Sequence, residues 1–254
     1  MSKSTKILNN PPIVLTLCQL KHDEWKELPI KEIERVENKL TEIYPIKIER
    51  FNSELNGLEE VRKHGVGRSK INITSDTKLQ RIEFRSKDQK KKLILAENFI
   101  LFSDESVYQS WDVQKASIMA VLDILMPVYQ DIDLNRLSLR YVNRFIFNEF
   151  DDPSRYFTTI ISTSDGHQTI GDLYAYQFRL TTIDPNTNIR THITHNLDFD
   201  VTNKYQYILD IDVLDESVIA FNVDTIDTNL TSINEKLVDT FFNNITKQTA
   251  ELCS

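Results

Sequence analysis

The sequence predicts an α+β protein built on a largely antiparallel sheet, with three main amphipathic helices. Three observations support this class. Apolar residues recur at steps of three and four in only three segments, which is typical of helices that bury one face. Between these segments lie runs rich in β-branched and aromatic residues, which are typical of strands. Because helices and strands do not alternate one for one, the sheet should be mainly antiparallel.

The first strand is predicted at residues 11–20, where two prolines lead into an apolar, β-branched run. Pro29 then begins a helix that ends at Pro45, because proline is tolerated only in a first helical turn. One face of that helix carries Ile30, Ile33, Val36, Leu40 and Ile43. Residues 46–102 are predicted to form strands, with a solvated hairpin turn at residues 87–92.

A second helix is predicted after a capping box at Ser106 and Gln109, and it should end near Pro127. Its apolar face carries Val107, Trp111, Ile118, Leu122 and Leu125. Further strands are predicted at residues 137–147, 157–162, 173–183, 189–199 and 205–213. Turn-forming residues 184–188 should join two of these strands as a hairpin. A closing helix begins at about Asp227 and keeps an apolar face to Leu252.

This order divides the chain into two similar β-rich halves, residues 1–130 and 131–254, each closed by a helix. We expect the halves to pack as one compact unit, because no linker rich in proline, glycine or serine separates them. A degenerate duplication with its break near residue 130 would explain the order, although no residue-level repeat accompanies it.

Charge is distributed unevenly along a chain whose formal net charge is −8. Residues 1–130 carry 21 Lys and Arg against 19 Asp and Glu, and residues 131–254 carry 9 against 19. Because phosphate binding needs basic charge, these totals argue against nucleic acid as a partner. An acidic face that meets a basic protein is the functional interpretation, and drift in surface composition is the alternative.

Composition and motifs exclude several function classes. The chain has five glycines, and none lies in a dinucleotide fingerprint, a phosphate loop or a nucleophile elbow. We therefore predict no catalytic residue, no cofactor and no metal site, which leans against an enzyme. No apolar stretch is long enough for a membrane span, and the N-terminus lacks a secretion signal, so we expect a cytoplasmic protein without a membrane partner. Cys18 and Cys253 are predicted to be reduced thiols.

Two weaker motifs carry little chemistry. His192 and His195 are the only close histidine pair, and on a strand their odd spacing directs them to opposite faces, which argues against a shared metal. A second motif could present backbone N–H groups and positive charge to a phosphate. Its residues are Gly65, Gly67, Arg68 and Lys70. Because the strand–loop–helix context of phosphate motifs is missing, a simple hairpin loop is the alternative.

The most specific polar pattern lies on two predicted strands. Arg140 and Arg144 share one face of the first strand, and Asp210 and Asp212 share one face of the second. Both faces are otherwise apolar, so we expect the arginines to meet the aspartates across the sheet. A structural ion-pair network is one interpretation, and a pocket in which the arginines bind a carboxylate or phosphate is the other. Two aspartates are too few ligands to predict a divalent cation.

At these residues the chain resembles a known family. PPIV at residues 11–14, LRYVNR at 139–144 and LDIDV at 209–213 occur in the same order and at similar spacing in a sporadically distributed family of uncharacterised bacterial proteins of similar length. The resemblance covers nearly the whole chain, and the family's mid-chain tryptophan is similar to Trp111. It implies a place in bacterial mobile-element or phage-defence systems, and it implies no reaction.

The leading hypothesis is a non-enzymatic cytoplasmic interaction protein of such a system. It would work with another protein, and a partner with a basic surface is one option. Self-association is left open. Two alternatives remain: a small-ligand or nucleotide sensor that uses the Arg/Asp pocket, and, more weakly, a metal-dependent nuclease-like enzyme that uses the aspartates.

Overall fold

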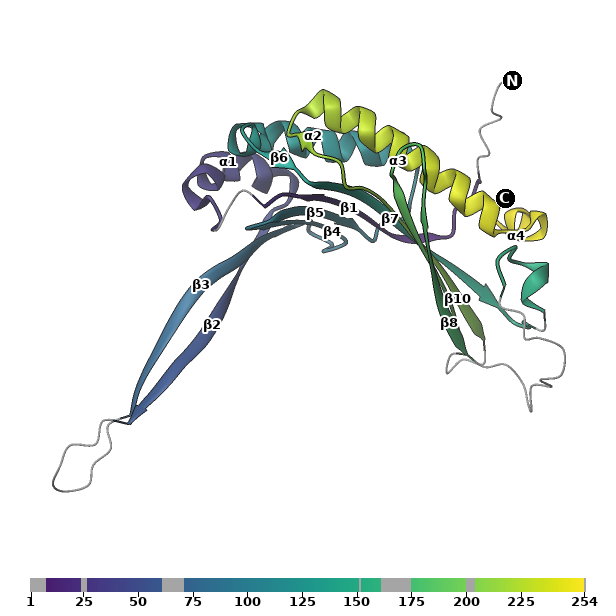
Figure 1. Cartoon of the computed structure of the whole chain (residues 1–254), viewed down its shortest axis with the longest axis horizontal. Coiled ribbons are helices and arrows are strands. Elements are labelled where there is room, and N and C mark those ends of the chain that lie inside the picture. Colours follow the sequence, from purple (N-terminus) through teal and green to yellow (C-terminus); the bar gives the residue numbers. More distant parts are fainter. Residues whose placement is uncertain are drawn as a thin grey trace.

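A single antiparallel sheet dominates the fold (Figure 1). The computed structural model describes residues 8–23, 27–60, 71–150, 152–160, 175–199 and 204–253. Within this part of the chain the sheet has nine strands in the order β2-β3-β4-β5-β1-β7-β10-β9-β8. Together with the three long helices it confirms the predicted α+β class.

The first half of the chain contributes one side of the sheet and two helices. Its strands are β1 (Ile13–Lys21), β2 (Ile46–Glu60), β3 (Ile71–Arg85), β4 (Lys91–Ala96) and β5 (Phe99–Asp104). Its helices are α1 (Ile30–Ile43) and α2 (Trp111–Tyr129). Strands β2 to β5 form an antiparallel meander whose last strand pairs with β1.

The second half contributes the other side. Its strands are β6 (Asp133–Leu134), β7 (Arg136–Phe147), β8 (Tyr176–Ile183), β9 (Arg190–Phe199), β10 (Tyr205–Asp215) and β11 (Ile219–Ala220). Its helices are η1 (Pro153–Arg155, one 3-10 turn), α3 (Val223–Asn244) and α4 (Lys247–Leu252). The meander from β8 to β10 pairs with β7, and β7 pairs with β1. One sheet therefore continues across residue 130, while the duplication stays a prediction.

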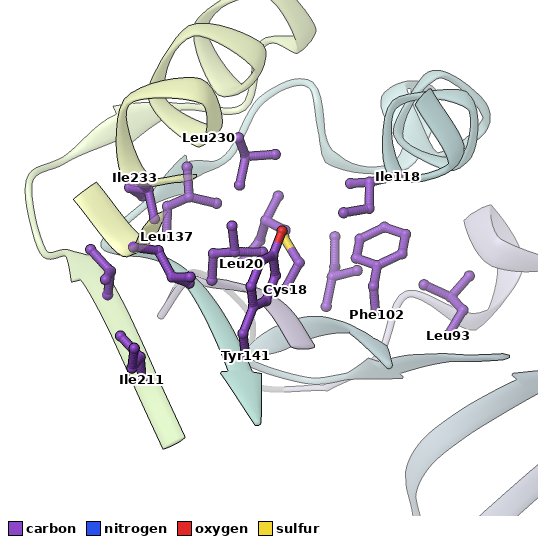
Figure 2. Packing of buried hydrophobic residues seen from close by; sticks show 14 of the residues in the cluster. Cys18, Leu20, Leu93, Phe102, Ile118, Leu137, Tyr141, Ile211, Leu230 and Ile233 are labelled. Atoms are coloured by element: carbon purple, nitrogen blue, oxygen red, sulfur yellow. The ribbon is translucent and has the colours of Figure 1, made fainter. Parts of the chain in front are cut away.

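All three long helices lie on the same face of the sheet (Figure 1). Alternate strand residues point toward them, and Leu20, Leu137 and Ile211 are fully buried there. Figure 2 shows Ile118 of α2 and Leu230 and Ile233 of α3 reaching down to this layer. None of the helices in the described ranges combines the length and apolarity that a membrane span needs.

The opposite face of the sheet is concave. Both ends of the sheet, the β2–β3 arm and the β8–β10 arm, bend away from the helices (Figure 1). Among the described elements, no helix covers the hollow between the two arms. The sheet therefore has one face that forms the core and one face that the described helices leave uncovered.

Helix boundaries differ from the predictions where caps decide them. Helix α2 begins at Trp111 and not after Ser106, because the Ser110 side chain accepts a hydrogen bond from the Val113 N–H. Pro127 does not end the helix, which runs on to Tyr129. A proline so close to the last turn removes only one intrahelical hydrogen bond.

The predicted strand at residues 157–162 is wrong over its described part, residues 157–160. Phe157 forms only an isolated bridge, to Ile245, and its ring stacks on Tyr207 in an aromatic cluster. The other two predicted strand residues lie outside the described ranges. The bridge coincides with a break in the closing helix, which separates α3 from α4.

One smaller prediction is also corrected. The closing helix begins at Val223, earlier than Asp227, because Asn222 caps it through the Thr225 N–H. Strands β6 and β11 are two residues each, too short for a periodic pattern to reveal.

Candidate functional site

The four charged residues of the predicted Arg/Asp site all lie on the concave face. Arg140 and Arg144 belong to β7, and Asp210 and Asp212 belong to β10. In the antiparallel register, Arg140 lies directly opposite Asp212. Residues on alternate positions of these strands, such as Tyr141, point into the core instead.

Arg140 and Asp210 form a two-bonded ion pair. The Arg140 Nε donates to Asp210 Oδ1 at 2.8 Å, and Nη2 donates to Oδ2. The hydrogen bonds to Asp210 raise the pKa of Arg140, although partial burial acts against this. The pair is diagonal across the two strands, within reach of a long side chain.

Asp212 and Arg144 behave differently from that pair. Asp212 lies 3.7 Å from Arg136 rather than pairing with Arg144, and burial raises its pKa despite the nearby cations. Arg144 is exposed, lies opposite Ile208, and forms no ion pair with either aspartate in the described structure. In the register Asp210 is diagonal to both Arg140 and Arg144, and both of its carboxylate oxygens are engaged by Arg140.

A double-mutant cycle on Arg140 and Asp210 should give a coupling free energy of about 0.5–1 kcal/mol. The value is modest because the Arg140 side chain is 43% exposed, so solvent screens the pair. Urea unfolding of Arg140→Ala, Asp210→Asn and the double variant measures it. A coupling above about 3 kcal/mol would instead indicate a buried network.

A second charged cluster, which the sequence analysis missed, lies at the other end of the concave face. Glu83 of β3 is only 3% exposed and is surrounded by arginines. Arg81 Nε donates to Glu83 Oε1 at 3.0 Å, Arg50 Nε donates to it at 3.4 Å, and Arg85 donates to Oε2. Burial alone would raise the pKa of Glu83, but these arginines outweigh it and lower the pKa.

The arginines of the concave face thus form two groups. We call Arg50, Arg81 and Arg85 the first arginine cluster. We call Arg136, Arg140, Arg144, Arg179 and Arg190 the second arginine cluster. Strand pairing places both clusters on one face, because residues directly opposite each other in adjacent strands point the same way.

Charge on this face is strongly basic in the described strands. Among the side chains that the structure describes, eleven cationic ones lie on it: the eight clustered arginines with Lys21, Lys78 and Lys92. Four of the described carboxylates share the face: Glu83, Asp198, Asp210 and Asp212. The opposite balance holds on the helices. In α1, α2 and α3 together, ten Asp and Glu accompany five Lys and Arg.

Between the two arginine clusters the centre of the concave face is largely apolar, although Gln19, Lys21, Lys92 and Ser103 also lie on these strands. Half-buried side chains cover the central strands: Leu15, Leu17, Ile94, Leu101 and Val142. Phe99 adds one aromatic ring at the end of β5. We call these apolar side chains the floor of the concave face. The floor lies between the first and the second arginine cluster.

The histidine pair is separated by the sheet. His192 lies on the concave face, where its Nδ1 is 2.8 Å from Thr181 Oγ1. His195 is buried on the helix face. Within the described residues, no three His, Cys, Asp or Glu side chains are grouped to hold a metal ion. The phosphate-loop candidates Gly65, Gly67, Arg68 and Lys70 lie outside the described residues.

Both cysteines are buried free thiols, and burial raises the pKa of Cys18 to about 12, so it remains protonated at neutral pH.

A cleft of about 360 Å³ lies on the helix side, between the starts of β1 and α2 and the side of α3. Its lining includes Tyr108, Trp111 and Phe241. The Arg/Asp residues do not line this cleft, since they lie on the opposite face.

Comparisons with protein-family models, with curated proteins and with solved structures give no match for this chain, so the family resemblance stays a prediction and the function must be argued from the geometry of the concave face.

Proposed function

We propose that the protein is a non-enzymatic interaction protein that holds an anionic macromolecular partner against the concave face of its sheet. The observation that carries the proposal is the sorting of charge by face: a basic concave face on a chain whose net charge is −8. Opposite potentials on the two faces would steer an acidic partner to the hollow and away from the helices.

The hollow suits a partner that stays bound. Several of its arginines are held by carboxylates in the sheet, as Arg140 is by Asp210 and Arg81 is by Glu83, so less side-chain freedom is lost on binding. Exposed members such as Arg144 and Arg179 have free surface for contact. The apolar floor between the clusters adds area that a partner can remove from water.

This proposal departs from the basic partner that the chain totals favour. The charge totals of the two halves add the acidic helices to the basic sheet face. A partner, in contrast, contacts one face at a time. The bacterial mobile-element or defence setting, and the cytoplasmic location, remain part of the proposal on the strength of the resemblance and the sequence alone.

Matched charge reversals on the two faces test the proposal. The tagged full-length protein, Arg144→Glu/Arg179→Glu on the concave face, and Lys31→Glu/Lys39→Glu on the exposed side of α1 are each purified from the native host. We expect the bound partner to fall about tenfold with the concave variant, which corresponds to about 1.4 kcal/mol. The helix variant should retain it. Equal recovery from both variants would refute the proposal.

A further inference from the structure

The geometry points to double-stranded DNA as the partner that the concave face holds. This inference rests on the proposed function and names the partner of the same face. Three observations carry it: the kind of cation on the face, the spacing of the two arginine clusters, and the scarcity of aromatic side chains between them.

Arginine is concentrated on the concave face far beyond its share of the chain. Eight of the ten arginines in the described residues lie there, against three of the thirteen described lysines. A general basic surface would draw on the commoner lysine. Arginine presents a planar fork of donors that matches the oxygens of a phosphate, and it inserts readily into DNA grooves.

The two arginine clusters are spaced for two rows of phosphates. Strands β3 and β7 are separated by four steps in the sheet order. At about 4.8 Å per step, the clusters begin about 19 Å apart at the backbone. Arg136 and Arg140 turn toward aspartates of β10, away from the first cluster. Arg144, which neither aspartate holds, is therefore the β7 side chain available to reach a phosphate row beside a groove about 12 Å wide. The two arms bend away from the helices on either side of the central strands (Figure 1).

The floor of the hollow favours a duplex over a single strand. Proteins that hold unpaired bases stack them on several aromatic side chains. Among the floor residues defined above, only Phe99 is aromatic. Aliphatic side chains such as Leu17 and Leu101 give a surface that contacts a groove without stacking. Sheets and β-ribbons are known to enter the grooves of B-form DNA, whereas the major groove of an RNA duplex is too narrow to read.

Fluorescence anisotropy with a mixed-sequence DNA duplex of two helical turns tests the inference on the full-length protein. We expect binding that weakens with salt, with a slope of log K against log salt of about −4.5, as for about five phosphate contacts. Arg144→Ala and Arg50→Ala, one from each cluster, should each weaken binding several-fold and reduce the slope by about one. Lys39→Ala, exposed on α1, is the matched control and should change neither.

Competition with other polyanions separates the possible outcomes. Tighter binding of single-stranded DNA, duplex RNA or an acidic polypeptide such as polyglutamate would overturn the assignment to duplex DNA. Duplex binding that is equal in the concave variants and in Lys39→Ala would also overturn it. If either occurs while the concave variant still loses its partner from the native host, the proposed function stands and only the DNA assignment fails. If that partner is retained, the proposed function fails as well.

Discussion

At pH 4.5 the protein should lose about 2–3 kcal/mol of unfolding free energy relative to pH 7 through His195 alone. Burial lowers the pKa of His195 to about 4, against 6.5 for an exposed histidine. Between these two values the unfolded chain binds a proton that the folded protein does not. The contribution of His195 to the free energy of unfolding is therefore fully present above pH 6.5 and is lost as the pH falls toward 4.

The surroundings of His195 explain why its charged form is disfavoured. The ring is fully buried on the helix face of β9. It stacks on Phe178 with ring centroids 4.6 Å apart, and Phe157 meets it edge-on. Its Nδ1 lies 2.6 Å from the Tyr207 hydroxyl, so a neutral ring can accept a hydrogen bond from that hydroxyl. Burial raises the pKa of Tyr207, which keeps the phenol protonated and available as the donor.

Urea unfolding at pH 7 and pH 4.5 measures the effect. His195→Gln removes the titrating ring and should shrink the difference between the two pH values by about 2 kcal/mol. His192→Gln, three residues away on the opposite face, is the control and should retain most of the difference. His195→Asn is measured as a second variant, so that the result does not depend on a single substitution that folds poorly. If both His195 variants lose as much stability on acidification as the unmodified protein, the buried histidine is not the cause.

Local sequence patterns predicted the elements and their faces well. Alternation along residues 137–147 placed Arg140 and Arg144 on one face of β7, and the turn at residues 184–188 does join β8 to β9. Such features depend on residues that are neighbours in the sequence, so the sequence pattern is sufficient to predict them. The cap at Ser110 shows the limit, since Ser106 offered the more typical pattern and only the folded chain selects between them.

Features that depend on strand register could not be predicted. Arg140 lies opposite Asp212 yet bonds Asp210, and Arg144 lies opposite Ile208, because pairing fixes which residues are neighbours. The same limit hid the buried Glu83, whose three arginines come from two strands. Summing charge along the chain also concealed the basic face, because acidic helices and basic strands alternate in the sequence.

Glu83→Gln should destabilise the protein by about 1–3 kcal/mol at pH 7 and at the same time tighten its binding to an anionic partner. The carboxylate is the one negative charge among the three arginines of the first cluster, and removing it leaves them facing one another. The loss stays below the 3–5 kcal/mol of a fully buried pair, because Arg50 and Arg81 are 49% and 41% exposed and solvent screens their charges.

The two effects separate stability from function at one residue. Because the pKa of Glu83 is lowered, its contribution is present above the pKa of an exposed glutamate, near 4.5, and is lost as the pH falls through the lowered value. The difference in unfolding free energy between Glu83→Gln and the unmodified protein should thus narrow at low pH.

Glu49→Gln is the control, because its carboxylate pairs with Lys47 on the helix side of β2. It should change stability by less than about 0.5 kcal/mol and leave binding unaltered. Equal stability of Glu83→Gln and the unmodified protein at pH 7 would mean that the arginines need no internal carboxylate to stay together. Unchanged affinity for the DNA duplex would mean that the first cluster lies outside the contact, which would restrict the partner to the second cluster.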